Sequence, residues 1–315
     1  MLDLRRLRIL HRLAERGTIA ATAEALHLTG PAISQHLAAL EREAGAQLLE
    51  KRGRTLALTP AGRLLVSHAG IILDDLSSAE SALAALTGRG TGTVRVAAFP
   101  SAARALVPPA WAALREHPEG PVALRLAEHE PDEAVAALVR RDVDVAVVHS
   151  YSLLPRNVPT SCDQCRLLDD PVLLALPPAL AAARGLVPNE SVALAEFAGE
   201  QWLVPRPEES CHEMIQRACG AAGFVPDTVA EATDFAVLTA LVTAGAGVAL
   251  VPRMALPAGP LAVSLHPPRD PVTRKVFALT GPGAARRPDV ARALDALTTA
   301  AAAVSGGPAD QRQNP

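Results

Sequence analysis

Side chains suited to nucleic acid gather at two places near the N-terminus. At the first place, hydroxyl, amide and imidazole groups can hydrogen-bond the edges of bases. At the second place, closely spaced cations can neutralise phosphates or enter a minor groove. The candidate DNA-contacting residues are therefore Pro31, Ser34, Gln35, His36, Lys51, Arg52 and Arg54. For the basic residues, a solvated turn is the alternative interpretation.

A second set of polar side chains stands directly after segments whose pattern predicts strands. In open α/β sheets, ligands bind beyond the carboxyl ends of strands and against helix N-termini. Hydroxyls at such places can hold an anion, and an arginine can pair with a carboxylate. We therefore expect a small-molecule site formed by Ser101, His149, Ser150, Arg206, Thr233 and Asp234. The alternative roles are structural: helix caps at Ser101 and Thr233, a solvated turn at Arg206 and a strand end at His149.

The four cysteines are too few for a disulfide scaffold in 315 residues. Cys162 and Cys165 have the spacing of a redox pair or half a zinc site, but they do not open a helix, whose dipole would lower a thiol pKa. Cys211 and Cys219 share one predicted helix, which places them about 12 Å apart, too far for a disulfide. We expect ordinary thiols, with no metal site and no cofactor. A metal- or thiol-switched sensor stays open as the alternative.

The sequence contains no recognisable catalytic constellation. It lacks Gly-x-Ser-x-Gly, His-Glu-x-x-His and a phosphate-binding glycine loop. The glycines between residues 88 and 92 precede a predicted strand, which is the wrong order for a dinucleotide site. The pattern therefore predicts a binding protein and not an enzyme.

The candidate DNA-contacting residues need a scaffold, and the caps around them predict a helix-turn-helix. Thr18 and Thr29 can each cap a helix, and Pro31 falls in the first turn of the second helix, where a missing N–H costs nothing. Apolar residues recur at helical spacing and predict a buried face: Ala23, Leu26, Ile33, Leu37 and Leu40. Ser34 and Gln35 then point outward, as base-reading residues of a recognition helix do. The basic turn at 52–54 lies between two short predicted strands and forms a wing.

The segment from Leu7 to Gly62 resembles the N-terminal signature of the LysR-type transcriptional regulators. The matching residues keep one unbroken register: Ala23, Leu26, Pro31, Ala32, Ser34, Leu40, Glu41, Gly45, Leu48, Glu50 and Leu58 to Gly62. The chain departs from the family pattern at Thr22, Gly30 and Leu49, where the family often has Ala, Gln and Phe. The resemblance implies a bacterial regulator whose dimers, assembling to a homotetramer, bind double-stranded operator DNA under the control of a small-molecule effector.

A long helix is predicted from about Pro60 to Leu86, with Thr59 as its cap. Its apolar residues form two interleaved series with a spacing of seven: Leu65, Ile72, Ala79 and Leu86, then Ala69, Leu76 and Leu83. Such a stripe needs a partner surface, and packing on its own chain is one possibility. The family resemblance implies dimerisation through this helix.

Strands and helices alternate beyond residue 93. The predicted strands are Val94–Ala98, Val122–Leu126, Val143–Val148, Val172–Ala175, Trp202–Val204, Val248–Val251 and Val276–Leu279. The predicted helices lie near 101–116, 131–140, 178–184, 208–222, 234–244 and 288–303. A looser resemblance to the same family at 142–147, 218–226 and 241–252 implies two Rossmann-like lobes with the effector between them. It also implies chain crossings near 161–168 and 262–267.

Together these patterns predict an α/β protein with an N-terminal winged helix-turn-helix, a long linker helix and a C-terminal two-lobed effector domain like a periplasmic binding protein. The boundaries are 1–59 for the DNA-binding domain, 60–92 for the linker helix and hinge, 93–304 for the effector domain and 305–315 for a disordered tail.

Charge is distributed unevenly along the chain. Residues 1–68 hold ten Lys and Arg against six Asp and Glu, whereas the rest hold 20 against 27. A basic head on an acidic body is expected if only the head binds DNA. No apolar run reaches about 20 residues, and arginines interrupt any N-terminal signal peptide. We therefore expect a cytoplasmic protein with no membrane partner.

Overall fold

The computed structural model describes residues 1–52, 55–86, 92–256, 259 and 262–305. Its first unit is a head of three helices and a two-stranded wing: α1 (Leu4–Arg16), α2 (Ile19–Leu26), α3 (Gly30–Ala44), β1 (Leu49–Arg52) and β2 (Thr55–Leu58). The side chains of Asp3, Thr18 and Thr29 accept hydrogen bonds from backbone N–H groups in the first turns of α1, α2 and α3. The predicted winged helix-turn-helix is confirmed.

The head has a core of its own, which fixes the direction of α3. Ile33, Leu37 and Leu40 of α3 pack in one buried cluster with Leu10 of α1 and Leu48, which precedes the wing. Each such side chain stabilises the head by about 1.5–3 kcal/mol relative to exposure. The opposite face of α3 is consequently left for solvent or a ligand.

α4 (Pro60–Leu86) follows the wing and has the predicted bounds. The Thr59 hydroxyl accepts a hydrogen bond from the Gly62 N–H at 3.0 Å and donates one to the Gln47 carbonyl at 2.7 Å. The predicted apolar stripe is divided between two environments. Leu65 and Ala69 pack on the head core of the same chain, whereas Ile72 and Leu83 are 42% and 62% exposed.

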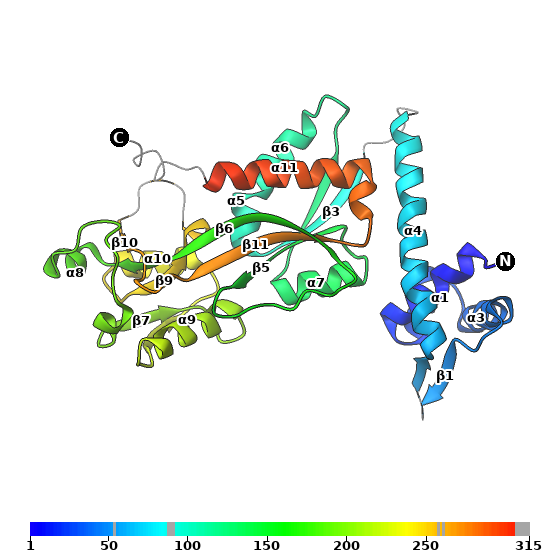
Figure 1. The fold of residues 1–315 in the computed structure, drawn as a ribbon, viewed down its shortest axis with the longest axis horizontal. Helices are drawn as coiled ribbons and strands as arrows, with labels where there is room; N and C mark the ends of the chain where they lie inside the picture. Colours follow the sequence, from blue (N-terminus) through cyan, green and yellow to red (C-terminus); the bar gives the residue numbers. More distant parts are fainter. Residues whose placement is uncertain (53–54, 87–91, 257–258, 260–261, 306–315) are drawn as a thin grey trace.

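The body begins with a lobe built on β3 (Thr93–Ala98), β4 (Ala123–Glu128), β5 (Val145–Tyr151) and β11 (Thr273–Thr280). β4, β3 and β5 are parallel neighbours, and β11 adds antiparallel to β5. One face of this sheet is covered by α5 (Pro100–Ala105), α6 (Val107–Arg115) and α11 (Pro288–Ser305), and the other by α7 (Pro131–Val139) (Figure 1). A 3-10 helix, η3 (Ala284–Arg286), precedes α11. We call this part lobe one.

Lobe two contains β7 (Gln201–Val204), β8 (Asp227–Glu231), β9 (Ala249–Pro252), β10 (Ser264–His266), α8 (Pro178–Ala183), α9 (Ser210–Ala221), α10 (Phe235–Thr243), η1 (Leu194–Phe197) and η2 (Arg253–Ala255). α8 and α9 pack in a buried cluster around Trp202. α10 packs in a second cluster with Leu203, which lies on the opposite face of β7. β8 and β10 were not among the predicted strands.

The long strand β6 (Asp163–Leu176) belongs to both lobes. Residues 163–171 pair with β11 in lobe one, whereas residues 172–176 pair with β9 and β10 in lobe two. The first chain crossing is therefore at 171–172, and the second falls in 267–272, between β10 and β11. The predicted crossing near 161–168 is wrong, because the polar segment 163–170 is itself a strand of lobe one. The predicted crossing near 262–267 falls slightly too early, because residues 264–266 form β10 of lobe two.

Charged side chains join lobe one to the head and to α4. In α1, the Arg12 guanidinium donates to the Arg140 carbonyl at 3.2 Å, and Arg16 lies 3.7 Å from the Asp142 carboxylate. On α4, the Asp75 carboxylate accepts a hydrogen bond from Arg286 at 2.6 Å. The predicted hinge residues 88–91 and residues 306–315 of the predicted tail lie outside the described residues. α11 itself extends through Ser305, the first residue assigned to that tail.

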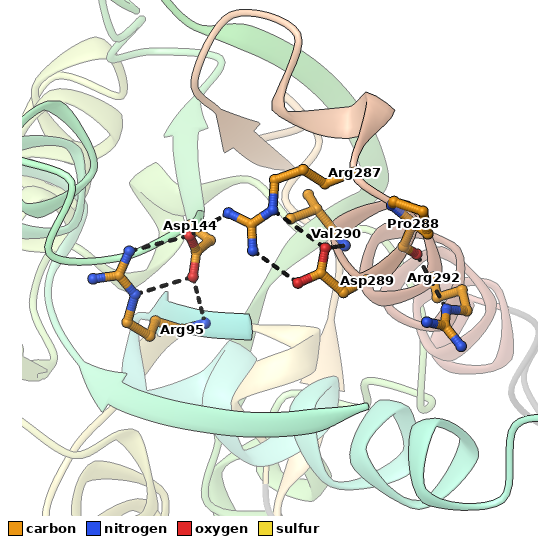
Figure 2. Close-up of polar contacts among 7 residues, drawn as sticks. All are labelled: Arg95, Asp144, Arg287, Pro288, Asp289, Val290 and Arg292. Carbon is orange, nitrogen blue, oxygen red and sulfur yellow. Dashed lines mark hydrogen bonds and ion pairs between the residues drawn. The ribbon is translucent and has the colours of Figure 1, made fainter. Parts of the chain in front are cut away.

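A charged network fixes the point where the chain enters lobe one (Figure 2). Asp144 accepts hydrogen bonds from the side chain and backbone of Arg95, and from Arg287 at 2.9 Å. Arg287 also donates to Asp289 at 2.7 Å. Although burial opposes it, the bonds from Arg95 hold the pKa of Asp144 below its ordinary value. Gly92 is needed beside this network, since a Cβ there would lie 2.6 Å from the Asp289 Cβ.

Candidate functional sites

α3 presents the expected base-reading residues on the side opposite its buried face. Pro31, Ser34 and Gln35 are exposed and His36 is half-buried. The Ser34 hydroxyl donates to the Gly30 carbonyl at 3.1 Å, a local bond that a base edge can replace. Pro31, Ser34 and Gln35 are three and four residues apart, so they share one exposed face on the N-terminal half of the helix, which is the part of a recognition helix that meets base edges.

The wing carries the expected phosphate contacts only in part. β1 and β2 pair antiparallel from Leu49 opposite Leu58 to Arg52 opposite Thr55, and Lys51 between them is exposed. Arg52 is the last residue of β1, but its side chain lies outside the described part of the molecule, as does all of Arg54. The DNA contacts of Arg52 and Arg54 stay predictions.

A narrow cavity of about 30 Å³ lies between the two lobes and is partly open to solvent. Lobe one contributes residues at the carboxyl ends of β3 and β4, together with side chains of β5 and β11. Lobe two contributes residues at the N-terminal ends of α9 and α10. Four of the six expected small-molecule contacts line this cavity: Ser101, His149, Thr233 and Asp234.

The two hydroxyl residues of this group are not helix caps. Phe99 occupies the cap position of α5, and Ser101 lies buried in the first turn. The cap of α10 is Asp234, whose Oδ1 accepts the Ala236 N–H at 2.8 Å, and Thr233 precedes it. The simple capping interpretation therefore applies to Asp234 and not to Ser101 or Thr233.

Two side chains of β5 bring unsatisfied polar atoms to the cavity. His149 and Tyr151 are 3% and 2% exposed, and among the described residues neither His149 Nδ1 nor the Tyr151 hydroxyl makes a hydrogen bond of normal geometry, although the Arg274 guanidinium lies close to that hydroxyl. The His149 ring packs edge-on against Phe99 at 4.5 Å and Tyr151 at 5.1 Å. Burial, reinforced by nearby Arg274, lowers the pKa of His149 well below its ordinary value, so the ring is neutral. Unsatisfied buried groups of this kind cost about 1–3 kcal/mol each, which a bound ligand can recover.

A buried ion pair forms part of the cavity wall. Arg274 on β11 donates to Asp170 Oδ2 on β6 from two nitrogens, at 3.0 and 2.7 Å. The other oxygen of Asp170 accepts the Met254 N–H at 2.9 Å. The guanidinium lies over the Phe99 ring, 5.0 Å from its centroid. Because Asp170 compensates its charge, Arg274 brings no net positive charge to the cavity.

Two glutamates complete the polar lining. Burial raises the pKa of Glu130 from 4.5 to about 7, and repulsion by Glu209 adds to the effect. Burial also raises the pKa of Glu209, whose carboxylate accepts a hydrogen bond from the Cys211 thiol at 3.4 Å. The cavity therefore contains two carboxyl groups that are poorly solvated and close enough to repel each other.

Two of the expected small-molecule contacts lie outside this cavity. Arg206 has a side chain that is 58% exposed and 3.9 Å from Glu208, and it does not line the cavity. The expectation that Arg206 pairs with a ligand carboxylate is therefore not supported by its position. Ser150 lines an adjoining groove, which shares His149, Tyr151 and Glu209 with the cavity.

The four cysteines are free thiols, and burial opposes ionisation of three of them. Burial raises the pKa of Cys211 well above its ordinary value and that of Cys219 to about 12. Burial also raises the pKa of half-buried Cys162. Thiol sensors depend on an accessible thiolate, which this burial opposes. Within the described ranges, no group of three or more His, Cys, Asp or Glu is placed to hold a metal ion.

The expected site did not include several polar lining residues, among them Glu130, Tyr151, Glu209 and Arg274. Glu130 stands between β4 and α7, where the rule that ligands bind at the carboxyl ends of strands applies as well as it does to Ser101. Glu209 stands at the start of α9 in the same way. Arg274 carries no sequence signal, since it lies inside a strand that was predicted only from residue 276 onward.

A winged helix-turn-helix joined by a long helix to a two-lobed body with a cavity defines a ligand-responsive transcriptional regulator. Two family models match the chain: the bacterial regulatory helix-turn-helix protein, lysR family, over residues 4–63, and the LysR substrate binding domain over residues 87–302. The chain belongs to the LysR family of bacterial regulators, which bind DNA and small-molecule effectors and form oligomers. Its homologues are transcriptional regulators, and the chain is accordingly a regulator and not an enzyme.

Individual relatives are distant. The chain is 28% identical to the nitrogen assimilation regulatory protein nac of Escherichia coli (strain K12) over 258 residues, which are 81% of this chain and 79% of that protein. It is 27% identical to the hydrogen peroxide-inducible genes activator of Escherichia coli O6:H1, over 81% of each chain. The crystal structure of ArgP from Mycobacterium tuberculosis shares the fold, with a TM-score of 0.67 at 20% identity, covering 96% of this chain and 98% of that one.

Across the described residues, the helices are too short or too polar to cross a membrane.

Proposed function

We propose that this chain is a dimeric or tetrameric cytoplasmic regulator whose operator binding is controlled by a small molecule held between lobe one and lobe two. In this proposal Ser34 and Gln35 read bases, with Pro31 and His36 beside them, and Lys51, Arg52 and Arg54 hold the DNA backbone. The observation that carries the ligand site is the pair of buried, unpartnered atoms of His149 and Tyr151 in a cavity between two lobes. A preformed cavity with a few convergent polar groups is the usual form of a small-molecule site.

The contacts between body and head support a route from ligand to DNA. Arg140 and Asp142 of lobe one touch α1, and Arg286 of the same lobe touches α4. Because these contacts tie the head to lobe one, a ligand that favours one placement of the two lobes also changes the position of the head relative to lobe two. The shift that it produces is limited by its differential affinity for the two placements.

The first experiment identifies the DNA. The purified full-length protein is used to retrieve genomic fragments, and the genes beside them indicate the metabolite to be titrated. We expect Ser101→Ala and Tyr151→Phe to weaken the response to that metabolite by roughly tenfold, while binding to the operator without metabolite stays unchanged. Ser191→Ala, on an exposed loop of lobe two, is the matched control. A wild-type response from Ser101→Ala, Tyr151→Phe and Thr233→Ala alike would place the effector elsewhere.

A thiol switch is the rival proposal, because one relative is named for induction by hydrogen peroxide. The raised pKa values of Cys162, Cys211 and Cys219 weigh against it. Titrating peroxide and zinc against the number of reactive thiols separates the two proposals. A stoichiometric loss of thiols that also changes operator binding would favour the switch.

A further inference from the structure

Carboxylates outnumber uncompensated cations around the cavity between the lobes. Glu130, Glu209 and Asp234 line it, together with Arg104 and Arg274. Asp170 already neutralises Arg274, and Arg104 lies 3.9 Å from Asp234 and donates to the Ala255 carbonyl. Within the described part of the chain, Glu130 and Glu209 have no ion-pair partner within 4.0 Å. The cavity therefore carries an excess of negative charge when both glutamates are ionised.

The groove beside the cavity adds little net charge, because its other carboxylates have basic partners. Asp132, Glu208 and Glu213 line it, and Arg156 is its single lining cation among the described residues. Arg156 is already paired with Asp132. Arg217 lies 2.6 Å from Glu213, and Arg206 lies 3.9 Å from Glu208. Glu209, which borders both the groove and the cavity, therefore favours a cation over an anion at the point where they meet.

The negatively charged glutamates line the same cavity as the unpartnered polar atoms described above. His149 Nδ1 and the Tyr151 hydroxyl are almost fully buried in the same cavity wall as Glu130 and Glu209. The phenol is a hydrogen-bond donor, and the neutral imidazole can donate or accept. A ligand that satisfies them needs an oxygen or a second polar group in addition to its charge.

We propose that the cavity binds a small molecule that carries a protonated amine or guanidinium between Glu130 and Glu209 and a hydrogen-bonding oxygen or nitrogen at Tyr151 and His149. The assignment rests on the proposed function, since it gives the chemical class of that effector. It replaces the carboxylate expected from the sequence, whose intended partner Arg206 does not line the cavity.

The test uses three four-carbon probes of matched length and different charge: 1,4-diaminobutane, butane-1,4-diol and butanedioate. Thermal unfolding and calorimetric titration of the full-length protein are followed at pH 8, above the pKa of about 7 of Glu130. We expect the diamine to raise the melting temperature and to bind at least ten times more tightly than butanedioate, with the diol between them. Equal shifts, a preference for butanedioate, or no shift with the diamine at 20 mM would overturn the proposal.

Two double variants test whether the preference for the diamine depends on Glu130 and Glu209. Glu130→Gln with Glu209→Gln keeps the size of both side chains, and we expect it to lose the tenfold preference for the diamine. Glu116→Gln with Glu119→Gln makes the same charge change on the exposed surface near the end of α6, and we expect it to keep the preference. A preference that survives in the first double variant would also overturn the proposal.

Operator binding by the same samples tests the proposed regulatory function separately from the proposed ligand class. If a metabolite changes operator binding through Ser101 and Tyr151 but the diamine does not bind, the charge assignment is wrong and the regulatory function stands. If the diamine binds in a manner that depends on Glu130 and Glu209 but no cavity ligand alters operator binding, the ligand class stands and the regulatory function fails.

Discussion

Arg274 of β11 and Asp170 of β6 face each other in register, one residue before β6 leaves lobe one for lobe two. Their shortest nitrogen–oxygen distance is 2.7 Å, and both side chains are 2% exposed. Asp170 also accepts the Met254 N–H, from the segment that follows β9. One ion pair thus ties together the crossing strand, the cavity wall and a segment of lobe two.

Removing one charge of this ion pair should lower the free energy of unfolding more than replacing both residues by apolar ones. Asp170→Asn keeps an oxygen for the Met254 N–H but leaves the Arg274 charge buried without a counter-charge, and we expect a loss of about 3–5 kcal/mol in the free energy of unfolding. Asp170→Leu combined with Arg274→Met should recover part of that loss, because no uncompensated charge remains. Urea unfolding of the single and double variants measures the difference. A double variant less stable than Asp170→Asn would show that the hydrogen bond to Met254 dominates.

Glu130 should make the ligand-free protein less stable as pH rises. Its pKa is about 7 in the folded protein and 4.5 ordinarily, so the folded state holds the proton more tightly. The proton therefore stabilises the fold fully below pH 4.5. This contribution falls between pH 4.5 and 7 and is absent above pH 7.

Replacing Glu130 by Gln removes this dependence. We expect Glu130→Gln to be more stable than the native protein by roughly 2–4 kcal/mol at pH 8 and by little at pH 4.5. The groups that face Glu130 are Glu209, Arg274, Arg156 and Glu128, and none of them is altered by this change. Glu116→Gln is the matched control. A gain of equal size at both pH values would contradict the assigned pKa.

Substitutions of base-reading residues and of backbone-binding residues should have different effects on DNA binding. Ser34→Ala or Gln35→Ala should relax sequence preference by about 1–3 kcal/mol for each hydrogen bond to a base that the substitution removes. Lys51→Ala should weaken binding to all sequences similarly and reduce the salt slope by about one unit. Arg115→Ala, on the exposed end of α6, should change neither. Operator variants titrated at several salt concentrations provide the measurement. If a protein with both Ser34 and Gln35 replaced by Ala keeps the native sequence preference, these two residues do not read bases.

Assembly should depend on the exposed part of the α4 stripe. Ile72→Asp places a charge where we expect a partner helix, which should cost several kcal/mol of dimer stability, on the order of an unpaired buried charge. Val225→Asp makes the same kind of change on an exposed residue of lobe two. Sedimentation should show monomers for the first variant and native oligomers for the second. An Ile72→Asp protein that stays fully oligomeric would place the interface elsewhere.

Local signals predicted most of the elements, because caps and apolar spacing act over a few residues. The bounds of α4 and of α7 agree with the pattern within one residue. The first half of β6 was missed because its residues are mostly polar, and the ladder with β11 that holds them is a contact between distant parts of the chain. The seam on α4 was divided for a similar reason, since Leu65 and Ala69 serve the head core.

The candidate site was predicted where chain geometry alone decides it. Ser101, His149, Thr233 and Asp234 lie at the ends of strands or the starts of helices, and the structure brings them to one cavity. Arg206 satisfied the same rule but points to solvent, because the rule locates a loop and not the direction of a side chain. The charge of the cavity depends on which arginines already have partners, and Asp170 beside Arg274 is visible only in three dimensions.

The continuity of β6 through both lobes has a mechanical consequence. Two lobes joined by loops can swing apart at little cost, but here their sheets share a strand whose backbone groups pair along its length. Closure of the lobes on a ligand must therefore bend β6 together with the strands that are hydrogen-bonded to it. We expect small angular motions with a built-in restoring force, so that the body returns to its resting shape when the ligand leaves.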